Sequence, residues 1–278
     1  MRTAHLLFGV GAVAMVARLL DAQAGVVLQI KPHVGDTLLM RLDQQTAMSG
    51  VRGSGSGETS AMVANGVLMF SRAIVEPGVP GATTLLAIMD SVVITTSDKH
   101  GRVAAQQVGE RLRGQRVRFR VSPDGTVGMN GGATSLSRQA SQSVSLVPAA
   151  FPTTAVHVGE RWVRELPLPT GGEFGTPLSG TLRATFRLDS VTHRGEFAYV
   201  SMQGELRPAI GPGLPWGTVV EDGMVQGTIL VNQRRGWLTD TWFTIVIRST
   251  ASSQSAMGGP FTHVRTRITQ HMHTLNRR

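Results

Sequence analysis

The sequence predicts a mainly β protein built on an antiparallel sheet or barrel, and two observations predict it. Short apolar segments alternate with turns rich in Gly, Pro, Ser and Asn, and several of these segments lie roughly 8–15 residues apart. The segments 116–121 and 126–129 flank Ser122-Pro123-Asp124-Gly125, where an Asp-Gly pair supplies the positive φ that a tight hairpin turn requires. This spacing is typical of antiparallel hairpins rather than of strands joined by crossover helices.

Each expected strand is an apolar or alternating segment bounded by turn residues. Besides the two strands of the hairpin, strands are expected at 26–30, 37–43, 62–72, 85–96, 162–166, 182–191, 196–205, 219–231, 238–249 and 261–273. The acidic pair Glu221-Asp222 precedes Gly223 and is expected in a hairpin turn. The GSGSG stretch at 53–57 is interpreted as a linker.

Two segments have helical spacing. In 133–147 the residues Leu136, Ala140, Val144 and Val147 recur at helical intervals, and Pro148 ends the pattern. The pattern at 103–112 is weaker because Gly109 interrupts it.

The first residues have the pattern of a cleavable secretory signal peptide. Met1-Arg2 gives a positive start, an apolar run covers 6–17, and Ala22 and Ala24 form an Ala-x-Ala cleavage site. The run is shorter than the about 20 apolar residues that a membrane-spanning helix needs. We therefore expect cleavage after Ala24, which would leave a periplasmic or secreted protein.

The composition excludes several classes of function. With no cysteine, the chain has no disulfide, no thiol catalysis and no thiolate metal site. The formal net charge is +9, and only Lys31 and Lys99 are lysines. This charge is expected first of all to form a simply solvated basic surface, and attraction to an anionic envelope surface, which suits an exported protein, is the alternative. No nucleic-acid-binding motif accompanies the charge. The aromatic content of 5% argues against an integral membrane barrel with its aromatic girdles.

Three short motifs recur in the same order in both halves of the chain. HVGD at 33–36 matches HVGE at 157–160, MDSV at 89–92 matches LDSV at 188–191, and the turn at 119–127 matches that at 230–238. The matches predict two similar β-rich halves, 25–152 and 153–278, after the signal peptide at 1–24. Short β motifs also recur by chance, so one continuous domain is the alternative.

Several of these features together resemble a family of exported bacterial β-rich proteins of unknown function. They are the signal peptide, the opening segment 28–42 with Val34-Gly35-Asp36, the turn at 122–125 and VGERW at 158–162. The family is similar in outline to the lipoprotein-carrier type of fold. The resemblance implies a strongly curved antiparallel sheet or half-barrel whose concave apolar face is covered by one or two short helices. The segment 133–147 would be that lid, and the resemblance implies no catalytic residues.

The search for catalytic and metal motifs leaves histidine as the remaining candidate. Phosphate loops, the dinucleotide glycine fingerprint, the HExxH zinc helix and the GxSxG elbow are absent. His271 and His273 would lie on one face of a strand, and His263 shares that face. Arginines flank them and no acid is near in the sequence, whereas a metal site usually includes a carboxylate. The sequence therefore predicts a solvated polar face, with no metal site and no cofactor, and adventitious metal binding is the alternative.

Other polar residues in apolar surroundings are given structural roles. His33 and His157 occupy matched positions in the repeat and are expected to belong to turns. Asp90 and Asp189 each lie in an apolar strand, so each is expected to meet an arginine or backbone N–H groups at a bulge or strand end.

The expected function is that of a non-enzymatic envelope protein that binds or carries a lipid or other hydrophobic ligand in an apolar concavity. The expected lining residues are Met69, Leu86, Ile88, Leu136, Val144 and Trp216. Trp216 lies in a rigid Gly/Pro-rich loop that could hold an aromatic ring at the rim of a cavity, with core packing as the alternative. The alternative function is a structural or interaction module of the cell envelope with no small ligand.

Overall fold

A computed structural model describes residues 25–52, 59–78, 80–129, 151–167, 180–192, 194–208, 218–251 and 262–275. The predicted signal peptide at 1–24, the linker at 53–57 and the predicted helix at 133–147 lie outside the described residues. The described part of the chain forms one antiparallel sheet of eleven strands and one helix. The predicted mainly β fold is confirmed.

The strands are long and are linked in an order that joins the two halves of the chain through β1 and β11. Their order across the sheet is β5-β4-β3-β2-β1-β11-β10-β9-β8-β7-β6. Their bounds are β1 (Thr37–Arg52), β2 (Thr59–Glu76), β3 (Thr83–Thr96), β4 (Arg116–Val121), β5 (Val127–Met129), β6 (Arg161–Pro167), β7 (Gly180–Val191), β8 (Phe197–Pro208), β9 (Thr218–Asn232), β10 (Trp237–Ala251) and β11 (Thr262–Leu275). The helix is α1 (Arg102–Leu112).

Every predicted strand except one is confirmed, and most are longer than predicted. The hairpin turn is also confirmed, since Gly125 has a φ of 86° and donates its N–H to the Ser122 carbonyl at 2.8 Å. The predicted turn at Glu221-Asp222 is wrong. Both residues lie inside β9, where Asp222 is opposite Arg248 of β10 and accepts a hydrogen bond from its Nε at 2.7 Å. A cross-strand ion pair thus explains the acidic residues that suggested a turn.

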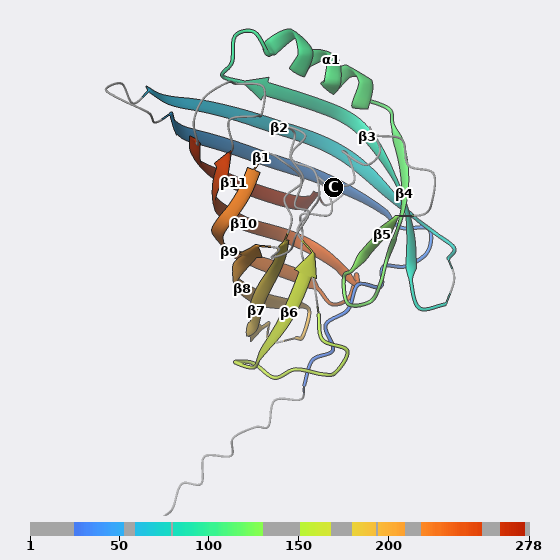
Figure 1. Ribbon diagram of the computed structural model, residues 1–278. Helices are drawn as coiled ribbons and strands as arrows, with labels where there is room; N and C mark the ends of the chain where they lie inside the picture. Colours follow the sequence, from blue (N-terminus) through green and yellow to red (C-terminus); the bar gives the residue numbers. More distant parts are fainter. Residues whose placement is uncertain are drawn as a thin grey trace, which may run out of the picture.

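The sheet is strongly curved and open, with β5 and β6 as its two edges (Figure 1). Residues alternate between a buried and an exposed face, most plainly in β4, where Val117, Phe119 and Val121 are buried and the intervening arginines are exposed. The buried residues of the other strands share the inner, concave face and form one continuous core. We call the opposite surface the outer face.

The helix α1 covers an edge of the sheet. β4 pairs with β3 only over residues 83–88, so the second half of β3 has no strand on that side within the described residues. α1 lies along this free edge (Figure 1), and a Cβ on Gly109 would stand 2.9 Å from the Val92 carbonyl oxygen. The weaker helical prediction at 103–112 is therefore confirmed. The glycine at position 109 lets the helix pack closely against β3. The segment 133–147, which is expected to form the lid over the concave face, lies outside the described residues, so the lid stays a prediction.

The residues before β1 form a strap across one end of the curved sheet. The predicted strand at 26–30 is wrong, because this segment makes only an isolated bridge between Val26 and Val156. Ile30 donates its N–H to the Pro123 carbonyl in the β4–β5 turn, and Lys31 donates to the Gly236 carbonyl in the β9–β10 turn, each at 2.8 Å. We call residues 25–36 the strap.

The strap also contributes to the core at this end of the sheet. Leu28 and Ile30 are 1% and 2% exposed. Phe151, which is fully buried, donates its N–H to the Asp124 carbonyl at 2.7 Å and accepts a hydrogen bond from Arg164 Nη2 at 2.8 Å. The strap and the segment around Phe151 thus connect hairpins that the sheet itself holds far apart in strand order.

The two HVG turns have the same geometry. Gly35 and Gly159 have φ values of 93° and 89°. The His33 N–H donates to Asp36 Oδ2 at 3.2 Å, and the His157 N–H donates to Glu160 Oε2 at 2.8 Å. That backbone hydrogen bond lowers the pKa of Glu160. The predicted turn role of both histidines is confirmed.

The wider duplication is less regular than the matched turns. The HVG turns begin β1 and β6, and the turns at 122–125 and 233–236 join β4 to β5 and β9 to β10. The two Asp-Ser motifs break this correspondence, because one lies on β3 and the other on β7. The division into halves at 25–152 and 153–278 stays a prediction, while the described strands form one continuous sheet.

Asp90 and Asp189 occupy bulges, as expected. The register shifts at each of them, so that neither residue has a directly opposed partner. Arg72 Nε donates to both carboxylate oxygens of Asp90, at 3.0 and 2.9 Å, and Ser201 Oγ donates to Asp189 at 3.1 Å. The interpretation as structural carboxylates is confirmed.

Replacing Leu28 with Ala tests the strap. We expect the free energy of unfolding to fall by about 2–5 kcal/mol, the usual cost of emptying a buried leucine site. Val27→Ala is the matched control, because Val27 lies next to Leu28 and is 49% exposed. Urea unfolding of both variants measures the difference, and equal midpoints would contradict a role for the strap in the core.

Gly236 tests the hydrogen-bonded junction between the strap and the β9–β10 turn. It has a φ of 58°, and a Cβ there would lie 2.3 Å from the Lys31 carbonyl oxygen. Gly195 also has a positive φ, 66°, but open space around it. Both Ala variants carry the backbone strain, and only Gly236→Ala also displaces the strap.

We expect Gly236→Ala to be destabilised by about 1–3 kcal/mol beyond Gly195→Ala, the typical cost of overpacking. Thermal unfolding followed by circular dichroism measures both. If Gly195→Ala is as unstable as Gly236→Ala, the loss of stability comes from backbone strain alone and not from displacement of the strap.

Candidate functional site

The concave face carries a tightly packed floor near the strap. β1 contributes Leu38, Met40 and Leu42, and the facing strands supply further apolar residues, all 8% exposed or less. These are Met69, Ala73, Val75, Leu85, Ala87, Met89, Phe186, Leu188, Val200, Met202, Ile229, Val231 and Met272. Their burial means that this part of the concave face is the protein core.

A belt of polar side chains crosses the concave face beyond this floor. Gln44 on β1 is opposite Gln270 on β11, and they are 8% and 0% exposed. Thr46 and Thr241 face the same way and are also buried. Gln44 Oε1 and Thr241 Oγ1 have no hydrogen-bond partner within the part of the chain that the structure describes. A buried polar atom without a partner is costly, so these atoms call for a donor or acceptor from outside the described residues.

Partly buried apolar side chains lie on the concave face beside the polar belt and beyond it. By strand register, Val67 and Ile94 are level with Gln44, Ile268 is level with Thr46, and Met48 and Val63 lie farther from the strap. We call this part of the concave face, from the row of Gln44 outward and away from the strap, the wide end. It combines apolar surface with the unpaired Gln44 Oε1 at its inner border.

The structure separates the predicted lining residues. Met69 lies on the concave face and is 5% exposed. Leu86 and Ile88 alternate with the buried Leu85, Ala87 and Met89, so they point to the outer face, opposite Arg118 and Arg116 of β4. They cannot line one concavity with Met69. Leu136, Val144 and Trp216 lie outside the described residues.

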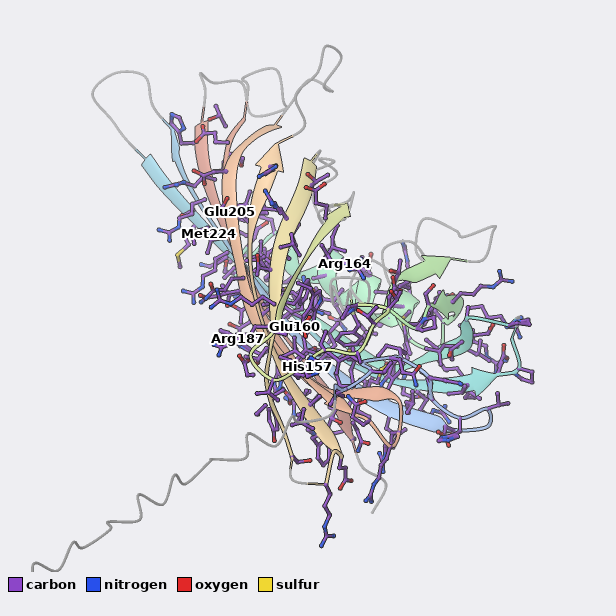
Figure 2. The ribbon with its side chains drawn as sticks, turned by 90° about the horizontal axis from the view of Figure 1, so that it is seen from below. His157, Glu160, Arg164, Arg187, Glu205 and Met224 are labelled. Atoms are coloured by element: carbon purple, nitrogen blue, oxygen red, sulfur yellow. The ribbon has the colours of Figure 1, made fainter. Side chains whose placement is uncertain are left out.

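The outer face of β6 to β11 is hollowed into a groove of about 970 Å³. Six arginines and two carboxylates line it, which gives a net charge of +4. They are Arg161, Arg183, Arg187, Arg207, Arg248 and Arg265, with Glu205 and Asp222. Val163 and Met224, 47% and 69% exposed, add apolar surface. Figure 2 shows Arg187, Glu205 and Met224 on this side of the sheet and Arg164 on the other. We call this hollow the arginine groove.

Two pairs of arginines stand directly opposite each other in the arginine groove. Arg161 faces Arg187 across β6 and β7, and Arg248 faces Arg265 across β10 and β11. Like charges in this position destabilise a sheet unless something neutralises them. Asp222 bonds Arg248, which lowers the pKa of Asp222 and keeps it ionised. Arg187 has only a long ion pair, 3.7 Å, with Asp189.

The three histidines of β11 have different surroundings. His263 Nδ1 lies 3.2 Å from Thr250 Oγ1 and 3.4 Å from Glu221 Oε1. His271 and His273 both contact the carboxylate of Asp240. No acid is near these two histidines in the sequence, but Asp240, distant in sequence, is adjacent to them across the strands. Only the pairing of β10 with β11 reveals it.

No protein-family model matches the sequence, and no curated protein matches it. Solved structures resemble the fold. Lipovitellin, in a structure of its lipid–protein interactions, is 12% identical with a TM-score of 0.47, and the match covers 88% of this chain and 26% of that chain. The chain thus spans about a quarter of the lipovitellin chain it matches.

Two further structures match with lower scores. Outer membrane protein OprG from Pseudomonas aeruginosa is 7% identical, with a TM-score of 0.21 and 89% and 100% of the two chains covered. DynF from the dynemicin biosynthesis pathway of Micromonospora chersina is 8% identical, with a TM-score of 0.21 and 91% and 88% covered. We therefore base the proposed function on this chain's own residues. In the described part of the chain, no helix has the length and apolar character needed to cross a membrane.

Proposed function

We propose that this protein is an exported, non-enzymatic envelope protein that binds an amphipathic, lipid-like molecule at the wide end of its concave face. The observation that carries the proposal is the border of that surface. Partly buried apolar side chains adjoin Gln44 Oε1, which is buried without a partner in the described residues. A ligand with an apolar chain and one polar group matches this combination.

The polar group of such a ligand would donate the hydrogen bond that Gln44 Oε1 lacks. The amide oxygen of Gln44 can only accept a hydrogen bond. A hydroxyl, an amide N–H or a protonated carboxyl group is a suitable donor. A buried water molecule could do the same without any ligand, so the experiment must separate these two occupants.

The chemistry of the concave face supports a binding role rather than catalysis. Over residues 37–50 of β1, 62–76 of β2 and the described side chains of β7 to β11, the inward side chains are apolar, amide or hydroxyl groups. General acid–base catalysis on a ligand there would need a titratable group within hydrogen-bond reach. The inward Arg164 of β6 is engaged with the Phe151 carbonyl.

Native mass spectrometry with solvent extraction tests the proposal. The full chain is expressed with its N-terminal segment and purified from the periplasm without detergent. We expect one lipid-like molecule per protein chain. A ligand-free protein that also ignores fluorescent fatty-acid probes would overturn the proposal and leave an envelope interaction module as the function.

A matched pair of variants locates the ligand. Gln44→Leu removes the unpaired acceptor, whereas Gln45→Leu changes the exposed neighbour on the outer face. We expect Gln44→Leu to weaken fatty-acid probe binding about fivefold, corresponding to one hydrogen bond of about 1 kcal/mol, and Gln45→Leu to leave it unchanged. Unchanged binding in Gln44→Leu would assign a water molecule to this atom.

The arginine groove supports a second function, attachment to an anionic lipid surface. Six arginines against two carboxylates leave an excess of positive charge that an anion would neutralise, most clearly at the opposed pair Arg161–Arg187, and the exposed Met224 adds an apolar contact. Arginine forms paired hydrogen bonds to phosphate, so phospholipid headgroups fit this surface. This function is compatible with ligand binding on the concave face, because the two surfaces lie on opposite sides of the sheet.

Vesicle sedimentation tests the groove. We expect binding to phosphatidylglycerol vesicles, none to phosphatidylcholine vesicles, and a marked loss at high salt. The double variant Arg161→Gln/Arg187→Gln should weaken binding at least tenfold, since each arginine near an anionic surface contributes about 1 kcal/mol.

The control removes the same charge from another part of the sheet. Arg116→Gln/Arg120→Gln changes two exposed arginines of β4. Equal losses in the two double variants would show that only net charge matters and would contradict a specific role for the groove.

A further inference from the structure

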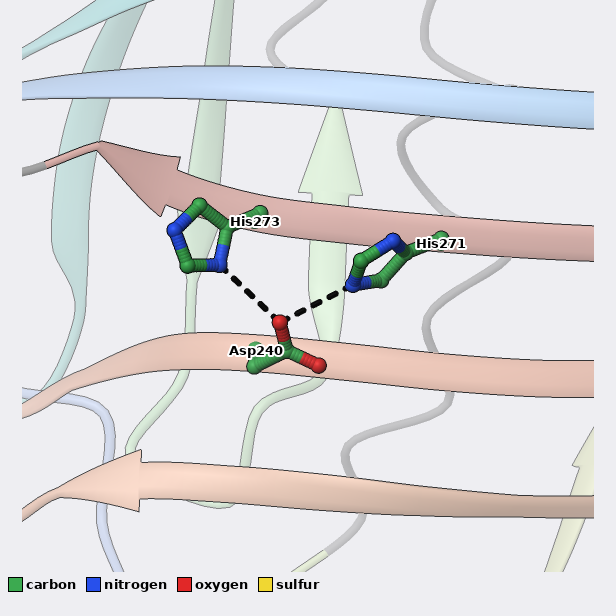
Figure 3. A group of neighbouring side chains, drawn as sticks. All are labelled: Asp240, His271 and His273. Atoms are coloured by element: carbon green, nitrogen blue, oxygen red, sulfur yellow. Dashed lines mark hydrogen bonds and ion pairs between the residues drawn. The ribbon is translucent and has the colours of Figure 1, made fainter.

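Asp240, His271 and His273 gather on the outer face where β10 meets β11. His271 and His273 point the same way because side chains on a strand alternate with a period of two. Asp240 is directly opposite His273, next to a register shift between Leu238 and Asp240. Figure 3 shows the carboxylate between the two imidazoles.

The three side chains converge on one point. Asp240 Oδ2 lies 2.9 Å from His271 Nε2 and 2.9 Å from His273 Nδ1. The three candidate ligand atoms all lie within 4.8 Å of one another. Zinc bonds imidazole nitrogen and carboxylate oxygen at about 2.0–2.2 Å. Small side-chain rotations that replace the two hydrogen bonds would therefore place all three atoms around one ion.

The surroundings leave room for the ion and for a further ligand. The side chains of His271 and His273 are each 45% exposed, and that of Asp240 is 33% exposed. Three protein ligands with an open fourth position form the usual zinc arrangement in which water completes the tetrahedron. The partial exposure gives an ion a path from solvent.

The charges around the cluster do not oppose a cation. On the other side of β11, Arg41 and Asp43 of β1 stand opposite His273 and His271. Arg41 Nε donates to Asp43 Oδ2 at 2.8 Å, so this arginine is neutralised by its own ion pair. On the far side of β10, Asp240 is opposite the uncharged Leu230 of β9.

Among the described residues of β11, the arginine closest in sequence to His271 is Arg267. It lies four residues away, or about 13 Å along an extended strand. The Asp240 carboxylate is the charged group in direct contact with the two imidazoles.

We propose that Asp240, His271 and His273 form a binding site for a divalent transition metal of the zinc class, with the ion linking β10 to β11. Two imidazole nitrogens and one carboxylate oxygen suit Zn²⁺, and the same set binds Ni²⁺ and Cu²⁺. The site is separate from the concave face, because these side chains point to the outer surface. It does not depend on the proposed lipid-like ligand.

Isothermal titration of the metal-free, untagged full chain with ZnCl₂ tests the site. We expect one Zn²⁺ per chain. Asp240→Asn, His271→Ala and His273→Ala should each weaken binding at least tenfold, since even partners that only orient metal ligands change affinity 10- to 100-fold.

His263→Ala is the matched control. His263 lies on the same strand and outer face as the other two histidines and also meets one carboxylate, Glu221, but it does not belong to the three-ligand cluster found among the described residues. It should retain wild-type zinc binding. If His263→Ala loses as much affinity as His271→Ala, zinc binds to surface histidines in general and the proposed site is overturned.

A second measurement distinguishes loss of the metal site from poor folding of a variant. A ligand that binds only the folded state raises the melting temperature. Zinc should therefore raise the Tm of the wild type and of His263→Ala, and not that of His271→Ala or Asp240→Asn. Absence of binding and of any Tm shift in the wild type at 100 µM zinc would overturn the proposal, whatever the outcome of the lipid experiments.

Discussion

The strap across the end of the curved sheet is the constraint on which the rest of the structure depends. An open sheet of eleven strands has two free edges, and nothing in its ladder of hydrogen bonds sets how far those edges curl toward each other. Ile30 and Lys31 bind carbonyl groups in the β4–β5 and β9–β10 turns, which belong to opposite halves of the sheet. Leu28 and Ile30 fill the space between. The strap therefore holds the curvature, and the curvature creates a concave and an outer face.

The two faces carry different chemistry because strand residues alternate. The concave face is apolar except for the belt around Gln44 and Gln270, and its burial decreases from the strap toward the wide end. The outer face carries the ion pairs, the arginine groove and the cluster of Asp240, His271 and His273. Sheet stability depends on the first face, and the contacts proposed with an anionic surface and a metal ion depend on the second. A change on one face can consequently alter one role without altering the other.

The positive charges of the arginines on the outer face are neutralised unevenly. Arg72 and Arg248 each bind a carboxylate on a neighbouring strand, and Arg118 of β4 reaches across β3 to bind Glu76 of β2. The bond from Arg118 lowers the pKa of Glu76, as the bond from Arg248 lowers that of Asp222. In the arginine groove the carboxylates are too few, and arginines face arginines. This local excess distinguishes a binding surface from an ordinary solvated one, which net charge alone does not.

The sequence by itself determined the strands, the Asp-Gly hairpin, the HVG turns and the helix at 103–112, because these follow from local periodicity and turn chemistry. It also placed His271 and His273 on one face. Tertiary structure decided what depends on strand pairing: the neighbour of these histidines, Asp240, is about 30 residues away. Strand pairing likewise places Glu221 and Asp222 inside a strand, where the sequence predicted a turn. The segment 26–30 has the composition of a strand, but its backbone bonds go to two turns that only the folded sheet brings within reach.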